Sequence, residues 1–397
     1  MHFKTIKKCR ICSNNKFDII IDLGEQYIAN AFHKPDDPPI LTAPLELIKC
    51  TNCHLIQLSN SINRDLIYKT YWYKSGINQT MRDHLRGIAL AIQSMIKLEK
   101  GDKIIDIGCN DSTLLSNYPK DIIRIGIDPS NIKPDTADID IFINDYFTAE
   151  RLRGYKAKVI TSIAMFYDLD DPRRFVQDIK NCLTDDGIWV LELSYMPSML
   201  RTVSYDTICA EHLCYYTLST FQKVLENTGL EVFDVEFNDI NGGSFRLFVS
   251  QIDRQPISVD LQDVLDKETE FNTLEPYNEF AMNVKKSKDK LLKFLEDNKN
   301  HKIYGYGAST KGQIILQYCN ITSKNLVAIA ERNPLKYDLY TPGTNIRICS
   351  EEEMRAAKPD YLLVFPWYFM DEFVSRERDL LKAGCHFVKP LPKFEIL

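Results

Sequence analysis

The sequence predicts an α/β protein in which a small cysteine-rich module precedes two Rossmann-like domains. Three observations lead to that prediction. Two C-x-x-C pairs stand near the N-terminus, an apolar run with a glycine turn occupies residues 103–111, and a similar run with a glycine turn occupies residues 302–312. An apolar run that ends in such a turn is typical of the first strand of a nucleotide-binding α/β unit.

Length and composition limit the classes of protein that fit. The chain has 397 residues, of which 44% are hydrophobic and 26% charged, so it fits two or three globular domains. Residues 1–8 lack the apolar stretch of a secretory signal and no run is long enough to span a bilayer, so we expect a cytosolic protein without disulfides. The net charge of −6 argues against broad nucleic-acid binding and leaves room for one local basic pocket.

The first module, residues 1–66, has the cysteine spacing of a metal site. Cys9 and Cys12 form one C-x-x-C knuckle, and Cys50 and Cys53 form the other. Four thiolates suit tetrahedral zinc and leave no coordination position open, so the pattern predicts a structural zinc site; unpaired buried cysteines are the alternative. The proline-rich segment between the knuckles is expected to form loops and short strands.

An aromatic stretch at residues 68–83 follows the module and leads into a helix expected to run to about Leu98. It places three tyrosines and a tryptophan beside Lys74, Ser75 and Asn78. Aromatic hydroxyls in such a stretch can close over a polar ligand, whereas the alternative is a strip that packs between domains.

The central domain, residues 67–254, opens on a turn with acidic side chains. Gly108 is its one glycine, Asn110 and Asp111 follow, and a helix is expected at residues 112–115. A turn that binds pyrophosphate normally contains three glycines, and an acidic side chain does not help to bind the phosphates. A sulfonium nucleoside with a protonated amino group can instead use Asp106 or Asp111, and Asp128 after the next strand can accept both ribose hydroxyls. These residues predict an S-adenosylmethionine site; any doubly wound domain with acidic strand ends is the alternative.

Strands and helices then alternate as in a parallel, doubly wound sheet. We expect strands at residues 139–143, 157–162 and 187–192 and a helix at residues 172–183. Ligands in such sheets lie at the carboxyl ends of the strands. By position, the adenine ring is expected against Asn144, Asp145 and Tyr146, and the donor pocket against Ala164 and Met165.

Acid–base chemistry is concentrated in the loop at residues 205–216. His212 can take a proton near neutral pH, and the adjacent Glu211 can orient it or stabilise its charged form; a buried, satisfied histidine is the alternative. The turn that starts at Asn241 and reaches Arg246 offers amides and one cation, which either meet a phosphate or make a hairpin.

The last part of the chain, residues 255–397, is expected to hold a helical arm and a second Rossmann-like domain. After the arm, a strand and glycine turn place Ser309, Thr310 and Lys311 at a helix start, where they can serve phosphate oxygens. Further strands at residues 327–331 and 361–365 support a nucleotide-binding domain over a purely structural one.

Taken in order, these segments resemble the S-adenosylmethionine-dependent sugar C-methyltransferases that act on nucleotide-linked 4-keto-deoxyhexoses. The similar motifs are the cysteine pairs and residues 75–83, 106–111, 211–212, 241–243, 305–312 and 330–334. The resemblance implies a class I methyltransferase domain in the centre and a dTDP-, GDP- or CDP-sugar between it and the C-terminal domain. One departure is Ala210, which stands where the family commonly has histidine and puts a second acid–base role in doubt.

The resemblance also implies roles for individual residues. His212 would remove the C3 proton beside the 4-keto group, Glu211 would orient His212 or contact the sugar, and Tyr73 would donate to the enolate oxygen. Contacts with the nucleotide-sugar are implied for Ser75, Asn78, Arg82, Asn241, Arg246, Tyr306, Ser309, Thr310, Lys311, Glu331, Arg332 and Asn333. Two other classes stay open: an O- or N-methyltransferase acting on a finished sugar, and an inactive relative that binds nucleotide-sugar.

Overall fold

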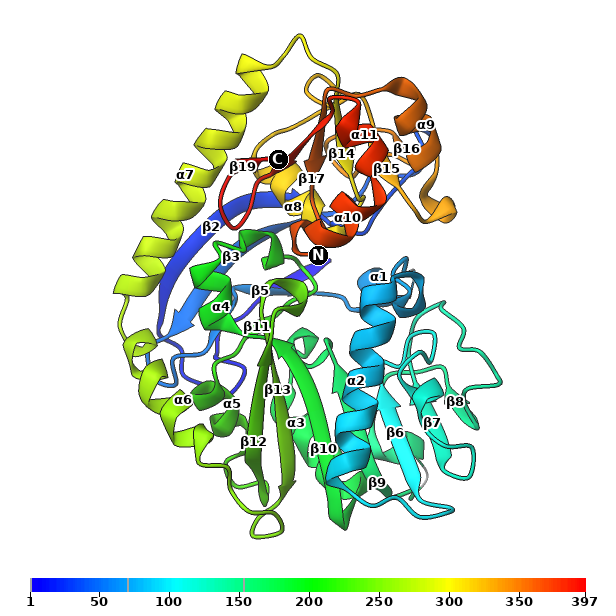
Figure 1. Ribbon diagram of the computed structural model, residues 1–397. Helices are drawn as coiled ribbons and strands as arrows, with labels where there is room; N and C mark the ends of the chain where they lie inside the picture. The colour runs from blue at the N-terminus through cyan, green and yellow to red at the C-terminus, as the bar shows by residue number, and fades with distance from the viewer. Residues whose placement is uncertain (1, 70, 153) are drawn as a thin grey trace.

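The computed structural model describes residues 2–69, 71–152 and 154–397. Within them the strands form a two-stranded and a four-stranded sheet in the N-terminal part, a seven-stranded central sheet and a six-stranded C-terminal sheet. Figure 1 shows the central sheet at the bottom, the C-terminal sheet at the top and the long helix α7 (Glu275–Asp297) along one side. The α/β class and the two Rossmann-like sheets predicted from the sequence are confirmed.

The N-terminal sheet is antiparallel, in the order β11-β4-β3-β2. The sequence predicted loops and short strands between the knuckles, whereas β2 and β3 are longer. A bulge at Gly24, with φ of 80°, lets β2 stay paired with β3 although β3 contains a proline. Edge strand β11 comes from the loop that carries His212, so this sheet is completed by the central part of the chain. The strands of this part are β1 (Phe3–Thr5), β2 (Phe17–Tyr27), β3 (Thr42–Cys50), β4 (Ile56–Leu58), β5 (Asn60–Ile62) and β11 (Cys214–Tyr215).

The central sheet has the order β12-β13-β10-β9-β6-β7-β8. The five strands from β8 to β10 are parallel, and β13 is antiparallel to both of its neighbours. Its inner residues, such as Ile105 and Ile160, are 0% exposed, which explains the continuous apolar runs in the sequence. The strands are β6 (Lys103–Ile107), β7 (Ile123–Ile127), β8 (Ile141–Ile143), β9 (Ala157–Ile163), β10 (Leu183–Ser194), β12 (Leu230–Asn238) and β13 (Ser244–Gln251).

Helices cover both faces of this sheet. Helix α2 packs with Ile104 and Val159 on one face, whereas α3 and α5 pack with Ile105 and Ile160 on the other. The helix expected at residues 112–115 is absent: turns and a 3₁₀ turn at Leu115–Asn117 take its place. The helices of the central part are α1 (Asp65–Tyr68), α2 (Gln79–Met95), α3 (Pro172–Cys182), α4 (Met196–Arg201) and α5 (Leu218–Leu225).

The C-terminal sheet has the order β16-β15-β14-β17-β18-β19 and is parallel except at β19. The helical arm that precedes it is divided in two: α6 (Asp260–Glu268) packs against α5 and β12 of the central part, and α7 extends to the C-terminal part. The remaining elements are β14 (Ile303–Tyr306), α8 (Thr310–Tyr318), β15 (Ile329–Glu331), β16 (Ile348–Ser350), α9 (Glu351–Ala357), β17 (Tyr361–Val364), α10 (Met370–Arg376), α11 (Arg378–Lys382), β18 (His386–Lys389) and β19 (Glu395–Ile396).

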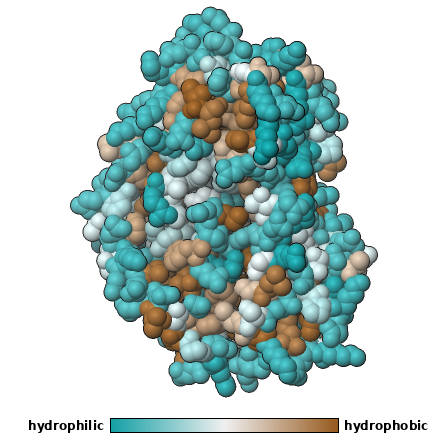
Figure 2. Space-filling model, in the orientation of Figure 1, coloured by the Kyte–Doolittle hydropathy of each residue, from teal (hydrophilic) through white to brown (hydrophobic). Residues whose placement is uncertain are grey.

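The surface gives no sign of a spanning segment. Across the described residues, no helix combines the length and the apolar character needed to traverse a bilayer. On the face drawn in Figure 2, hydrophilic residues predominate and the apolar ones are gathered in separate patches.

Candidate active site

A cavity of about 880 Å³ lies where the two large sheets meet. The carboxyl ends of β6, β7 and β9 open on it from the central sheet, and those of β14 and β15 open on it from the C-terminal sheet. The N-terminal part adds Asn30 and residues 61–64 to the wall. Ligand sites of α/β sheets lie at such strand ends, so one cavity has the elements of two sites facing each other.

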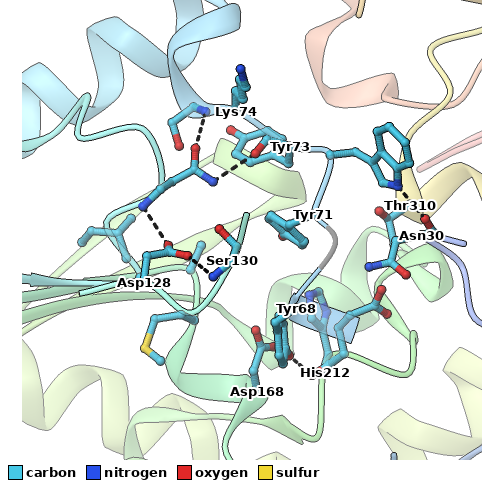
Figure 3. Close-up of a pocket in the computed structure, with 18 of the residues that line it drawn as sticks. Asn30, Tyr68, Tyr71, Tyr73, Lys74, Asp128, Ser130, Asp168, His212 and Thr310 are labelled. Carbon is cyan, nitrogen blue, oxygen red and sulfur yellow. Dashed lines mark hydrogen bonds between the residues drawn. The ribbon is translucent and has the colours of Figure 1, made fainter. Parts of the chain in front are cut away.

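Two carboxyl groups mark the end of the cavity beside β6 and β7. The Thr161 hydroxyl donates to Asp106 Oδ1 at 2.6 Å, and burial, together with the nearby charge of Asp128, raises the pKa of Asp106 to about 7. Asp128 accepts from the backbone N–H of Asn110 at 2.9 Å and of Ser130 at 2.8 Å, as Figure 3 shows. Each carboxylate oxygen has further lone pairs, so both groups can still accept from an ammonium or a ribose hydroxyl.

Most residues predicted for the donor line this end, and two do not. Gly108, with φ of 74°, Asn110, Asp145, Tyr146, Ala164 and Met165 line the cavity. The Asn144 amide instead donates to the carbonyls of Asp128 at 2.7 Å and Ser130 at 2.9 Å, and Asp111 Oδ2 accepts from the Gly76 N–H at 2.9 Å. Asn144 and Asp111 therefore hold the walls in place, and we no longer assign them direct contacts with the donor.

The aromatic stretch crosses the cavity as a strap, by which we mean residues 71–78. The Asn110 side chain joins this strap to the donor turn: its Oδ1 accepts from the Ser75 N–H at 3.1 Å and its Nδ2 donates to the Tyr73 carbonyl at 3.0 Å. Tyr73, Ser75 and Asn78 all line the cavity.

The strap is also tied to the other two parts of the protein. Trp72 Nε1 donates to the Asn30 carbonyl at 3.0 Å, and Asn333 Nδ2 donates to the Trp72 carbonyl at 3.2 Å. Both alternatives that the sequence left open for the aromatic stretch thus describe its position, because it lines a cavity and packs between domains.

His212 enters the cavity from the loop before β11 (Figure 3). Its Nδ1 lies 2.8 Å from the Thr207 carbonyl, and since a carbonyl only accepts, Nδ1 carries the proton and Nε2 keeps its lone pair. Burial, together with the positive charge of Lys311, lowers the pKa of His212 to about 3. The imidazole is therefore neutral at physiological pH. The Tyr167 ring packs edge-on against it at 4.4 Å between centroids.

Two carboxyl groups near His212 have unpaired oxygens. Both Glu211 carboxylate oxygens and Oδ1 of Asp168 are buried and have no hydrogen-bond partner in the part of the chain that is described. The Thr207 carbonyl, and not Glu211, thus holds the orientation of the imidazole. Sequence reasoning missed Asp168, although it follows β9 closely. Ala210 is buried and does not line the cavity.

The C-terminal part contributes cations and a helix start. Lys311 Nζ donates to the Asn241 carbonyl at 2.8 Å and lies 5.0 Å from the centre of the Tyr368 ring. Ser309 Oγ caps α8 by accepting from the Gly312 N–H at 3.0 Å. The cavity wall on this side includes Asn241, Tyr306, Ser309, Thr310, Lys311, Glu331, Arg332 and Asn333.

Two predicted substrate cations lie outside the cavity wall. Arg246 is 8% exposed and pairs with Glu192 at 3.0 Å and Glu236 at 2.7 Å, so its charge is already neutralised on β13. Arg82 donates to the Gly76 and Ile77 carbonyls at the base of the strap. The hairpin alternative therefore describes the turn before Arg246, and we withdraw both arginines as ligands of a phosphate.

The four cysteines of the knuckles form a single cluster. All four sulfur atoms lie within 4.8 Å of one another, with Cys9 and Cys53 at 3.4 Å and Cys12 and Cys50 at 3.5 Å. Tetrahedral zinc with bonds of about 2.3 Å brings its sulfur ligands to about 3.8 Å, so this donor set fits the ion. None of the four lines the cavity, which confirms the prediction of a structural zinc site.

Comparisons with known proteins agree with this arrangement. Residues 9–68 match the family model described as "Putative zinc binding domain", residues 80–235 match "Methyltransferase domain", and residues 239–392 match "C-methyltransferase C-terminal domain". A C-methyltransferase, NovU of Streptomyces niveus, is 26% identical over 99% of this chain and 97% of its own length.

Solved methyltransferase structures align with less than half of the chain. Magnesium protoporphyrin IX methyltransferase from Synechocystis PCC 6803, solved with bound SAH, is 10% identical over 45% of this chain and 90% of its own, with a TM-score of 0.35. An S-adenosylmethionine-dependent methyltransferase from Clostridium acetobutylicum ATCC 824 is 12% identical over 43% and 92%, with a TM-score of 0.32.

The family models follow one another in the order of the three structural parts, and the four-cysteine cluster falls within the first of them. The chain belongs to the S-adenosylmethionine-dependent C-methyltransferases that carry an N-terminal zinc-binding module.

Proposed function

We propose that the protein methylates C3 of a nucleotide-linked 4-keto-6-deoxyhexose. The observation that carries the proposal is the neutral His212, whose Nε2 is free to accept a proton in a cavity that two sets of strand ends enclose. The cavity has a volume of about 880 Å³, which is at the upper end for ligand sites and suits a donor and an acceptor bound together.

The reaction begins with His212 as the base. A 4-keto group acidifies the carbon beside it, so Nε2 can remove the C3 proton and leave negative charge on the keto oxygen. S-adenosylmethionine, when bound, supplies the electrophilic methyl group that this carbon attacks. The hydrogen bond from Nδ1 to the Thr207 carbonyl fixes the tautomer that the step requires.

Lys311 and Tyr73 are suited to the charge that develops on the keto oxygen. Lys311 lies close enough to His212 to affect its pKa, and its ammonium reaches the cavity from the C-terminal part. Tyr73 lines the cavity, and its hydroxyl keeps a proton to donate because a phenol is protonated at neutral pH. We assign both to the enolate oxygen, so the reaction uses residues from both large domains.

The donor belongs at the β6 and β7 ends. Asp106 can bind the amino group and Asp128 the ribose hydroxyls, while Gly108 lets the ligand approach the backbone; a Cβ there would lie 3.3 Å from Met165. Tyr146 is held in the same wall by its hydroxyl, which donates to Asp65 at 3.0 Å.

The nucleotide of the acceptor belongs at the C-terminal side. Helix α8 begins at the cavity wall, where Ser309 and Thr310 stand, and its first backbone N–H groups suit a phosphate. Arg332 lies in the same wall and is paired with Glu372 at 3.5 Å. Ser75 and Asn78 of the strap complete this wall opposite the sugar. We propose that a dTDP-, GDP- or CDP-linked sugar spans the distance from this helix start to His212.

Solvent exchange tests the base directly. The purified enzyme is incubated in D₂O with each of the three nucleotide-linked 4-keto-6-deoxyhexoses and without donor, and the C3 proton is followed by NMR. Exchange in the wild type and in the exposed control His301→Asn, with none in His212→Asn, is the expected result. Methyl transfer to oxygen or nitrogen without C3 exchange would instead establish an O- or N-methyltransferase.

A further inference from the structure

Two acids beside His212, the buried Glu211 and the half-buried Asp168, are not used by the mechanism above. Glu211 is 6% exposed, lines the cavity and has no hydrogen-bond partner within the described residues for either carboxylate oxygen. Asp168, which precedes α3, lines the same cavity, and its Oδ1 likewise has no hydrogen-bond partner within the described residues. Buried polar atoms are almost always paired, so three unpaired oxygens at one place indicate a ligand that supplies the partners.

The surroundings of this pair are neutral. The titratable groups that face it come from α1, the strap, the segment after β9, the loop before β11 and β11 itself; they are Tyr68, Tyr71, Tyr167, Cys209 and Tyr215. Among the described residues, neither acid forms an ion pair. Two cations reach the loop: Arg10 Nη1 donates to the Leu213 carbonyl at 3.5 Å, and Lys311 acts on His212 and Asp206.

Electrostatics then favours one proton for two groups. Burial raises the pKa of Glu211, and burial together with the charge of Glu211 raises the pKa of Asp168 well above its usual range. Two carboxyl groups that share a site cannot both ionise easily, because the second charge is repelled by the first. One acid therefore keeps its proton near neutral pH while the other can lose it.

We propose that Asp168 and Glu211 hold one proton between them and together bind a hydroxyl group of the acceptor next to the carbon that His212 deprotonates. A hydroxyl suits this pair because it donates to the carboxylate and accepts from the carboxylic acid. The identity of the acceptor rests on the proposed function, whereas the shared proton does not.

The pair would act as a specificity element. An acceptor without this hydroxyl leaves the polar oxygens of both acids without hydrogen-bond partners. Leaving them unpaired costs free energy, so the protein is expected to discriminate against that acceptor. We expect kcat/KM to fall by roughly a hundredfold or more for a panel member that lacks the hydroxyl next to C3.

Infrared spectroscopy tests the shared proton without any acceptor. A protonated carboxyl group has a C=O stretch that a carboxylate lacks. Because the pKa of Asp106 is also about 7, the spectra are recorded in an Asp106→Asn background, in which the pair is expected to give one such band at pH 7. Asp168→Asn and Glu211→Gln each remove it, while Glu150→Gln, on the exposed 3₁₀ turn Ala149–Leu152, keeps it. Two ionised carboxyl groups in that background, with no band to lose, would overturn the proposal.

Kinetics then tests the link to the acceptor. Binding of S-adenosylhomocysteine first confirms that each variant is folded. Asp168→Asn is expected to raise KM for the acceptor at least tenfold and to remove one ionisation from the pH profile of kcat/KM, which a merely structural role would leave in place. An unchanged pH profile would contradict the proposal. If no sugar of the panel reacts with the wild type, the proposed function fails, and the infrared band still decides the question of the proton.

Discussion

The contact between Asn110 and the strap gives the sharpest prediction of local energetics. Asn110 makes two hydrogen bonds to strap backbone, with Ser75 and Tyr73, and its φ is 51°. Replacement by glycine removes both bonds and keeps the left-handed backbone free of strain. At about 0.5–1.5 kcal/mol for each bond, the closed strap loses about 1–3 kcal/mol, which is roughly a 5- to 160-fold increase in the opening equilibrium.

Alanine at the same position adds a second cost. An alanine with positive φ is less stable than glycine by about 1–2 kcal/mol, so Asn110→Ala is expected to open the strap further than Asn110→Gly or to destabilise the turn itself. The difference between the two variants therefore separates the side-chain bonds from the backbone conformation.

Hydrogen exchange followed by mass spectrometry measures the opening directly. Peptides that cover residues 71–78 are expected to exchange faster in both variants by the factors above. Asn117→Ala is the matched control, because the Asn117 amide donates to the Thr113 carbonyl at 2.8 Å and makes no contact with the strap. Unchanged exchange of the strap in Asn110→Gly would refute the idea that this side chain holds it closed.

Four further predictions follow from the site. His212→Asn lowers methyl transfer by roughly 10²- to 10⁴-fold while calorimetry finds S-adenosylhomocysteine affinity unchanged; an equal loss of affinity would mean that the site is disturbed as a whole. Cys12→Ser lowers the zinc content measured by atomic absorption and the unfolding temperature, and full occupancy by zinc would contradict the four-cysteine site. Gly307→Ala is expected to raise KM for the acceptor at least tenfold, because the backbone φ there is 85° and the new Cβ would lie 2.6 Å from a proline ring. The control Gly87→Ala, whose Cβ would meet no atom within 4 Å, leaves KM unchanged. The pKa of Asp106 is about 7, so protonation below that pH removes the negative charge that would bind the ammonium of the donor. Donor affinity is therefore expected to fall as the pH decreases, and Asp106→Asn to flatten this dependence. A flat pH profile in the wild type would exclude this role.

The sequence predicted what local spacing and apolar runs determine. Strands such as β6 and β9 are buried on both faces, so their residues form continuous apolar runs that are visible without a structure. The four-cysteine site could also be predicted from the sequence, since each knuckle is a short motif and two knuckles complete a tetrahedral site.

Contacts between distant residues explain what the sequence did not predict. The expected helix at residues 112–115 is absent because Asn110 and Ser112 have positive φ, and Asn110 is held there by Asp128 and by the strap. Arg246 was assigned to a phosphate because its partner Glu192 lies on another strand. Long-range ion pairs leave no local pattern in a sequence.

Asp168 was missed for the same reason. Its environment depends on Glu211, which comes from a loop beyond β10, and neither residue has a partner that a motif would reveal. The strand β11, which adds the loop that carries His212 to the N-terminal sheet, likewise has only two residues and no apolar run of its own. Short elements of this kind are determined by tertiary packing and not by propensity.

Methyl transfer to a defined carbon tests the central claim most directly. The purified enzyme is incubated with S-adenosylmethionine and dTDP-, GDP- and CDP-4-keto-6-deoxyhexoses, and the products are analysed by mass spectrometry and NMR. The account predicts that one of the sugars gains a methylene mass, with the new methyl group on C3. A methyl group on oxygen or nitrogen, or no product with any of the sugars despite demonstrated donor binding, would contradict it.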